Sequence, residues 1–213
     1  MLLKDLLSDV PGVLETRGDA EIQALVTDSR EKARNGLFFC ISGMRFDAHD
    51  FAAQAVENGC VALVVERFVD SPVAQVRVDN VRRAAAYIAA AFYGHPARKL
   101  RMVGVCGTKG KTTTTYLMKA ILEKAGFKTG LIGTTGNLIG DRSLPSNMTT
   151  PDPVDLHRCL RQMVDEGVEA VSMEVSAAES SRPPTALRFS GLAQRYSASA
   201  APGKPKIISG NLP

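Results

Sequence analysis

Short apolar runs alternate with apolar residues at helical spacing along the first hundred residues. The runs are rich in β-branched and aromatic side chains, which is typical of strands. The expected strands are 37–41, 61–65 and 73–78. The expected helices are 1–10, a helix that Asp50 caps and Gly59 ends, and an alanine-rich helix from Asp79 or Asn80 to Phe92. Strands alternating with helices predict a small α/β domain over residues 1–98.

The alternation continues through a second segment. The expected strands are 100–105, 127–133 and 168–175. One expected helix is 116–125, with its apolar residues on one face: Leu117, Met118, Ile121, Leu122 and Ala125. Another runs from Asp152, the N-cap, through Pro153 to Gly167, and the polar segment 134–151 is expected to be a long loop. Residues 99–176 thus form a second α/β domain, expected to be incomplete because three strands are few for a doubly wound sheet.

The pattern ends after Ser176. More than half of residues 177–213 are Ala, Ser, Pro or Gly, and no strand or helix period is sustained there. This composition predicts a disordered tail or, alternatively, the product of a frameshift. The tail also carries the formal net charge of +4, because the first 176 residues hold equal numbers of basic and acidic side chains. A nucleic-acid-binding face is therefore not expected.

The remaining composition is that of an ordinary globular protein, with 45% hydrophobic and 23% charged residues. The four cysteines are scattered without a paired spacing, which predicts buried free thiols in a reducing compartment: Cys40, Cys60, Cys106 and Cys159. Residues 1–10 do not fit a signal peptide, and no apolar stretch approaches the length of a membrane span. We expect a cytoplasmic, monomeric protein.

The strand 100–105 and the helix 116–125 flank a glycine-bearing segment that ends in Gly-Lys-Thr. Glycines let backbone N–H groups turn toward an anion, and the start of a helix adds its partial positive charge. This arrangement predicts an ATP site in which Lys111 reaches the β- and γ-phosphates and the Thr112 hydroxyl helps to bind Mg²⁺. The residues expected to contact ATP are Gly107, Thr108, Lys109, Gly110, Lys111, Thr112 and Thr113.

The match to the general phosphate-loop pattern is imperfect, because Val105 stands where that pattern has its first glycine. The alternative is an ordinary glycine turn between a strand and a helix. Glu174 lies near the end of strand 168–175, where it is either a metal ligand or a surface carboxylate. The three histidines form no spaced cluster, so a capping or surface role is the default for His49, His95 and His157.

Several further motifs occur in a fixed order together with the phosphate loop. They are Thr-Asp-Ser-Arg at 27–30, Gly-Leu-Phe-Phe at 36–39, Phe-Asp-Ala-His-Asp-Phe at 46–51, Phe-Tyr-Gly-His-Pro at 92–96, Gly-Leu-Ile-Gly-Thr at 130–134, Thr-Thr-Pro at 149–151 and Met-Glu-Val-Ser at 173–176. In this order they resemble the Mur ligase family, and in particular its members that add the third residue of the peptidoglycan stem peptide. The resemblance covers residues 1–176, and the family's phosphate loop has the same short form.

The resemblance implies a UDP-binding N-terminal domain followed by part of a P-loop, Rossmann-like ATPase domain. The implied substrates are ATP, UDP-N-acetylmuramoyl-L-Ala-D-Glu and an amino acid, which are joined through an acyl phosphate. Ser29 would contact the uridine, and Thr112 with Glu174 would bind Mg²⁺. The muramoyl-peptide would be held by Thr149, Thr150 and Ser176.

The chain departs from the family after Ser176, where Ala-Ala-Glu-Ser-Ser follows in place of the usual Ser-His-Ala-Leu. The family's downstream histidine, its carbamylated lysine and its amino-acid-binding domain have no counterpart here, and Lys109 replaces the commoner asparagine. We therefore expect no ligase turnover from this chain alone. The alternatives are a nucleotide-binding regulatory or scaffold fragment and a folylpolyglutamate synthetase relative. The sequence does not indicate which amino acid is added.

Overall fold

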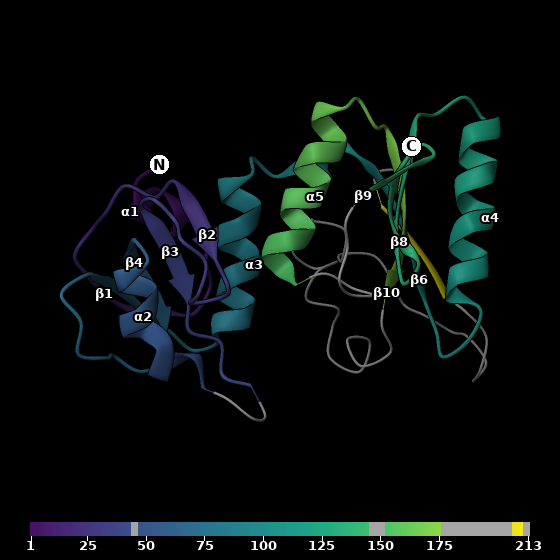
Figure 1. Ribbon diagram of the computed structural model, residues 1–213. Helices are drawn as coiled ribbons and strands as arrows, with labels where there is room; N and C mark the ends of the chain where they lie inside the picture. Colours follow the sequence, from purple (N-terminus) through teal and green to yellow (C-terminus); the bar gives the residue numbers. More distant parts are fainter. Residues whose placement is uncertain (44–46, 145–151, 176–205, 211–213) are drawn as a thin grey trace. The chain divides into compact units, whose positions relative to one another are not determined.

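The computed structural model describes the chain apart from residues 44–46, 145–151, 176–205 and 211–213 (Figure 1). The chain divides into two compact units, Met1–Phe92 and Tyr93–Pro213. The predicted boundary at residue 98 lies inside the second unit, in the short helix η2 (Pro96–Lys99). No helix of the described part is long and apolar enough to cross a membrane.

The first unit is built on a five-stranded sheet with the order β1-β5-β4-β3-β2. Strands β2 to β5 are parallel, and β1 pairs with β5 in the antiparallel sense. Ala52 and Ala55 of α2 pack in one apolar cluster with Phe38 and Leu63 of the sheet. The strands are β1 (Val13–Arg17), β2 (Ala24–Val26), β3 (Gly36–Phe39), β4 (Cys60–Val65) and β5 (Ala74–Val78). The helices are α1 (Leu3–Leu6), η1 (Ala48–Phe51), α2 (Ala52–Glu57) and α3 (Val81–Phe92).

Three local predictions for this unit were wrong. The helix expected over residues 1–10 is the single turn α1, and the expected strands did not include β1 or β2. Asp47 rather than Asp50 caps the helix, because a 3-10 turn precedes α2 and its N-cap carboxylate accepts from the backbone N–H of His49. β1 is an edge strand with exposed positions, so it lacks the strong apolar signal of the buried strands.

The second unit contains a six-stranded sheet with the order β11-β6-β10-β7-β8-β9. β10 pairs with β6 and with β7 in the parallel sense, and the other three pairings of this sheet are antiparallel. Helices α4 and α5 lie on opposite sides of this sheet (Figure 1). The strands are β6 (Arg101–Cys106), β7 (Thr129–Gly133), β8 (Gly136–Ile139), β9 (Arg142–Leu144), β10 (Ala170–Val175) and β11 (Lys206–Gly210), and the helices are α4 (Lys111–Lys124) and α5 (Pro153–Asp165).

Neighbouring residues of β10 point to the two helices in turn, as the pleat of a strand requires. Ala170 packs with Val103 and Leu122 on the α4 side. Val171 and Met173 belong to a larger core with the buried face of α5. By this alternation, Ser172 and Glu174 lie on the α4 side of β10, so the candidate metal ligand shares a face with the helix that follows the glycine-bearing loop.

The prediction of a loop over residues 134–151 was wrong for the first half of that segment, which forms the β8–β9 hairpin. Gly140 and Asp141 make its two-residue turn, a combination that is itself a hairpin signal. The predicted tail was also wrong for Lys206–Gly210, which forms β11 antiparallel to β6. Two adjacent isoleucines, Ile207 and Ile208, suit a strand, and β6 would otherwise leave its backbone unpaired at the edge of the sheet.

The predicted apolar face of α4 is only partly buried. Leu117 and Ile121 are 59% and 60% exposed, whereas Leu122 faces the sheet. Thr115 and Lys119 are buried beside it, and the Lys119 ammonium donates to Glu123 at 2.6 Å. Polar side chains with local hydrogen-bond partners therefore occupy buried positions on this helix, where the periodicity predicted apolar side chains.

The predicted start of α5 is confirmed. The Asp152 carboxylate accepts from the backbone N–H groups of Val154 and Asp155 at 2.8 and 3.0 Å, and Pro153 occupies the first turn. We expect Asp152→Ala to lower the free energy of unfolding by about 1 kcal/mol, because it removes an N-cap acceptor. Denaturant unfolding followed by circular dichroism would measure the change. Asp152→Asn keeps an oxygen at the cap and is expected to stay close to wild type, and an equal loss in both variants would contradict the capping role.

All four cysteines are free and buried, as predicted. Burial raises the pKa of Cys40 to about 12 and that of Cys60 and Cys159 to about 11. These three thiols therefore stay protonated near neutral pH, which makes them poor nucleophiles.

Candidate functional site

The segment between β6 and α4 forms an exposed loop at the carboxyl end of β6. Gly110 ends it in the left-handed conformation, with φ 78°, and is the N-cap of α4. No described side chain caps this helix, and a Cβ at Gly110 would meet no atom of the described residues within 4 Å. The first N–H groups of a 14-residue helix are thus left without a side-chain acceptor, which is the arrangement that binds anions.

Lys111, the first residue of α4, folds back over this loop. Its ammonium donates to the carbonyl oxygen of Gly107 at 3.0 Å. The Thr114 hydroxyl donates to the carbonyl of Gly110 at 2.8 Å, which ties the start of the helix to the loop. One loop and one helix start thereby bring together the predicted ATP contacts: Gly107, Thr108, Lys109, Gly110, Lys111, Thr112 and Thr113.

Glu174 is 1% exposed, so the alternative of a surface carboxylate was wrong. Its two oxygens accept from the backbone N–H and the hydroxyl of Thr134, at 3.2 and 3.0 Å. Glu174 lies in register with Val105 of β6, the strand that leads into the glycine-bearing loop. Thr134 closes the Gly-Leu-Ile-Gly-Thr motif at 130–134 but was not predicted as a site residue, although its place directly after the strand 127–133 was a usable signal.

Gly133 leaves the space that the Glu174 carboxylate occupies. A Cβ at Gly133 would lie 2.6 Å from Glu174 Oε1. We expect Gly133→Ala to displace the carboxylate, break its hydrogen bonds to Thr134 and lower the free energy of unfolding by about 1–3 kcal/mol. Thermal unfolding would measure the loss. Gly130→Ala is the control, because its Cβ meets the flexible end of Met163, and a larger loss there would contradict the argument.

The residues at this end of the sheet fit a magnesium ion that arrives with a nucleotide. The described part of the chain holds no group of three or more His, Cys, Asp or Glu side chains that could bind a metal alone. Mg²⁺ usually takes one or two carboxylates and completes its shell with phosphate oxygens and water. The buried Glu174 and the hydroxyl of Thr112 match that donor set.

Ser29 lies in the first unit, after β2, and is 9% exposed. Its hydroxyl donates to Oε1 of Gln54 at 2.7 Å, and its carbonyl accepts from Nδ2 of Asn58 at 2.8 Å. Gln54 of α2 and Asn58 at its C-cap therefore hold Ser29 in place, although both are distant from it in sequence. Gln54 and Asn58 were missed by the sequence analysis, since no local pattern reports a contact across 25 or more positions. The other predicted substrate residues, Thr149, Thr150 and Ser176, lie outside the described residues.

The default for the histidines was a capping or surface role, and the surface part of it is wrong for His49 and His157, which are both buried. The His49 ring accepts at Nε2 from the backbone N–H of Glu66 at 3.0 Å, so Nδ1 carries a proton and donates to Asp47 at 2.6 Å. Arg67, and then His49, hold the pKa of Asp47 below its usual range. His157 is 1% exposed, and neither ring nitrogen has a hydrogen-bond partner among the residues that the structure describes.

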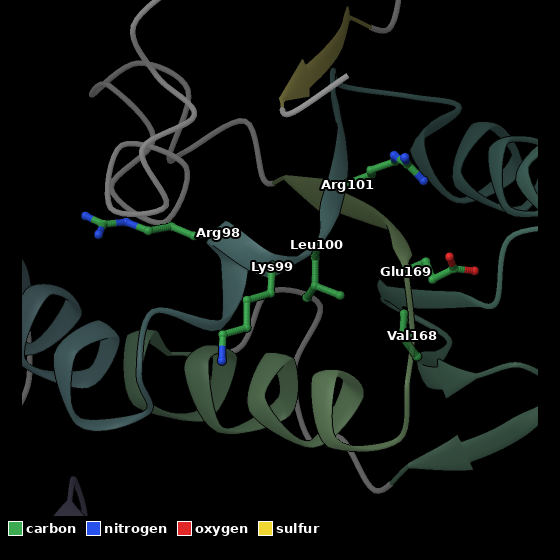
Figure 2. A pocket seen from close by; sticks show the side chains of 6 residues that line it. All are labelled: Arg98, Lys99, Leu100, Arg101, Val168 and Glu169. Carbon is green, nitrogen blue, oxygen red and sulfur yellow. The ribbon is translucent and has the colours of Figure 1, made fainter. Parts of the chain in front are cut away.

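A cavity of about 320 Å³ lies at the opposite end of β6 and β10, where these strands begin. Figure 2 shows its lining, with Arg98 and Lys99 pointing away from Arg101. The Arg101 guanidinium lies 4.5 Å from the centre of the Phe127 ring, and Glu169 accepts from the backbone N–H of Lys128. These charges do not converge, and ligands of such sheets bind at the carboxyl ends of the strands, so the cavity is not the candidate site.

Comparison with known proteins finds relatives of one kind. A family model described as the Mur ligase middle domain matches residues 105–189. The chain is 52% identical over 178 residues to the UDP-N-acetylmuramoyl-L-alanyl-D-glutamate–2,6-diaminopimelate ligase of Geobacillus thermodenitrificans, which covers 83% of this chain and 36% of that protein. The chain is thus similar to Mur ligases over 83% of its own length. A protein of the same name from Clostridium tetani is 39% identical over 183 residues, again over 83% of this chain and 38% of the relative.

Solved structures of Mur ligases share the mixed α/β fold. MurF from Acinetobacter baumannii matches with a TM-score of 0.56 and 28% identity, over 82% of this chain and 35% of that one. MurF ligase from Thermotoga maritima, solved in complex with ADP, matches with a TM-score of 0.54 and 26% identity, over 78% and 35%. The chain thus spans little more than a third of the length of these relatives. The predicted family resemblance is confirmed, and it favours Mur ligases over the folylpolyglutamate synthetase alternative.

Proposed function

We propose that this chain supplies the UDP-substrate-binding domain and the phosphate-binding part of an ATP-dependent ligase of peptidoglycan synthesis. The reaction joins an amino acid to UDP-N-acetylmuramoyl-L-Ala-D-Glu, and the names of the relatives favour 2,6-diaminopimelate as that amino acid. The observation that carries the proposal is the uncapped start of α4 with Lys111 folded over its loop and a buried carboxylate, Glu174, on the neighbouring strand.

In the proposed reaction, the substrate carboxylate takes the γ-phosphoryl group of ATP, which gives an acyl phosphate and ADP. The amino group of the incoming amino acid then attacks the acyl carbon and displaces inorganic phosphate, which forms the amide. Bringing a carboxylate to a triphosphate gathers negative charge, and a loop that stabilises this charge lowers the barrier. The amides at the start of α4 and the Lys111 ammonium would stabilise this charge. Thr112 and Glu174 would hold the Mg²⁺ that accompanies the nucleotide.

The sugar-peptide is assigned to hydroxyl side chains. Ser29 would contact the uridine part, and Thr149, Thr150 and Ser176 the muramoyl-peptide. Hydroxyls suit this substrate because they donate and accept hydrogen bonds without adding charge beside a triphosphate. A cytoplasmic location and a monomeric state go with this proposal as predictions.

Isothermal titration of the 213-residue chain with ATP, with and without Mg²⁺, tests the proposal. Saturable binding that weakens without Mg²⁺ and in Glu174→Gln supports the assigned phosphate and metal site. A folded chain with no affinity for ATP·Mg²⁺ or UDP overturns it. Because no turnover is expected from this chain alone, titration with UDP-N-acetylmuramoyl-L-Ala-D-Glu separates the alternatives. Binding of this substrate supports a part of a ligase, whereas a chain that binds ATP·Mg²⁺ but not this substrate supports a nucleotide-binding regulatory or scaffold protein.

A further inference from the structure

A two-residue turn joins β7 to β8 at the carboxyl end of β7. Gly133 pairs with Gly136 across this hairpin, so the turn consists of Thr134 and Thr135. Both threonines are exposed, whereas Glu174 on the neighbouring strand β10 is buried. The length of a hairpin loop restricts its turn geometry and its register. The turn therefore presents its two side chains in defined directions.

The two threonines hydrogen-bond to different elements. The Thr134 hydroxyl donates to Oε2 of Glu174 at 3.0 Å, and the Thr134 backbone N–H donates to Oε1 at 3.2 Å. The Thr135 hydroxyl lies 2.9 Å from the hydroxyl of Tyr116 on α4. One short turn is thus tied both to the strand that carries the candidate metal ligand and to the helix that follows the glycine-bearing loop.

The orientation of the Glu174 carboxylate depends on Thr134. Among the described residues, every hydrogen bond to this carboxylate comes from Thr134. Each oxygen takes one of them, although an ionised carboxylate offers about four acceptor sites in all. The remaining lone pairs can bind a metal ion while Thr134 holds the group in place. Carboxylates that bind metals are commonly held by hydrogen bonds of this kind.

We infer that Thr134 is a positioning residue of the magnesium site, which holds the Glu174 carboxylate in the orientation that binds the metal. The inference rests on the proposed ATP·Mg²⁺ site and adds to it one residue that acts through Glu174 rather than on the nucleotide. Loss of a group that orients a metal ligand typically lowers metal affinity by about 10- to 100-fold. The backbone N–H of Thr134 remains in any side-chain variant, so the lower end of this range, about 10-fold, is expected here.

Isothermal titration of the 213-residue chain with ATP, in Mg²⁺ and in EDTA, tests the inference. The measured quantity is the gain in ATP affinity that Mg²⁺ gives. Thr134→Val keeps the shape of the side chain without its hydroxyl. It is expected to reduce this gain about 10-fold while the affinity for ATP in EDTA stays the same. Thr134→Ser brings the hydroxyl back and is expected to restore the gain.

Thr135→Val is the matched control, because it removes a hydroxyl from the same turn whose partner is Tyr116 rather than Glu174. It is expected to leave the gain unchanged. An equal loss in Thr134→Val and Thr135→Val would show that only the fold of the turn matters, and the inference would be overturned. In a Glu174→Gln background, Thr134→Val is expected to have no further effect on the gain, since its hydroxyl acts through the carboxylate. A further loss in that background would also overturn the inference.

Circular dichroism confirms the fold of each variant, and Thr134→Ala, which removes the same hydroxyl, replaces Thr134→Val if the valine variant does not fold. If wild type shows the gain from Mg²⁺ and the folded variant without the hydroxyl keeps it, the inference is overturned and the metal site stands. If folded wild type binds ATP equally well in Mg²⁺ and in EDTA, or does not bind ATP, the inference falls together with the metal part of the proposed function.

Discussion

Lys111→Met is expected to weaken the binding of ATP·Mg²⁺ by about 10- to 150-fold, because a hydrogen bond to a charged group contributes about 1.5–3 kcal/mol. The ammonium of Lys111 already lies over the loop, donating to the Gly107 carbonyl at 3.0 Å. A phosphate oxygen in the loop would offer it a charged acceptor in place of that neutral carbonyl. Methionine preserves most of the side-chain length but neither the charge nor the donors, and isothermal titration would measure the affinity.

Lys124→Met is the matched control, since Lys124 is exposed in the last turn of the same helix. It changes the net charge by the same amount at a distance from the loop. A similar loss of affinity in both variants would show that Lys111 acts only through the overall field of the protein. Unchanged affinity in Lys111→Met, with the fold intact, would contradict the phosphate-binding role.

The phosphate loop could be predicted because its signal is local. A buried strand, glycines and an amphipathic helix follow one another within about 25 residues, and the N-cap of α5 at Asp152 is equally local. Glu174 was placed at the correct end of the sheet by the same reasoning. Its burial could not be predicted, because that depends on Thr134 and Gly133 from a strand about 40 positions away.

The failures have a common physical origin in non-local pairing. β11 is short, and it exists as a strand because the edge of β6 offers it unpaired backbone groups. Lys119 forms ion pairs with Glu123 and with Asp141 of the β8–β9 hairpin. Its burial could not be predicted, because a loop was expected where this hairpin lies. The Gly-Asp turn of that hairpin is a local sequence signal from which the hairpin could have been predicted. No local signal indicates which strand β11 pairs with.

His157 is expected to make the second unit sensitive to acid. Burial, and to a smaller degree the neighbouring His95, lowers the pKa of His157 to about 4 from an ordinary value of 6.5. In the unfolded chain the ring takes up a proton as the pH falls through about 6.5, but in the folded unit it stays neutral until about pH 4. Between these values the unfolded state binds more protons, so the folded state loses stability as the pH falls.

The expected loss from this one residue is about 3 kcal/mol between pH 7 and pH 4, since each unit of pKa shift corresponds to 1.36 kcal/mol. His157→Leu removes the titrating ring from a site where neither ring nitrogen has a described hydrogen-bond partner, and it is expected to abolish this part of the pH dependence. At pH 7 the variant is expected to be at least as stable as wild type, because an apolar side chain there leaves no polar atom unsatisfied.

Native-state hydrogen exchange of the α5 amides, corrected for intrinsic exchange rates, reports on this unit without requiring both units to unfold together. Carboxylates with lowered pKa values, such as Glu123 and Glu166, also lose stabilising interactions in acid. The decisive quantity is therefore the difference in the opening free energy of the α5 amides between wild type and His157→Leu. That difference is expected to grow steadily from pH 6.5 to pH 4. If the opening free energies of the two proteins instead change in parallel with pH, the pKa of His157 is not lowered in solution. That result would contradict the description of the ring as a buried group without hydrogen-bond partners among the described residues.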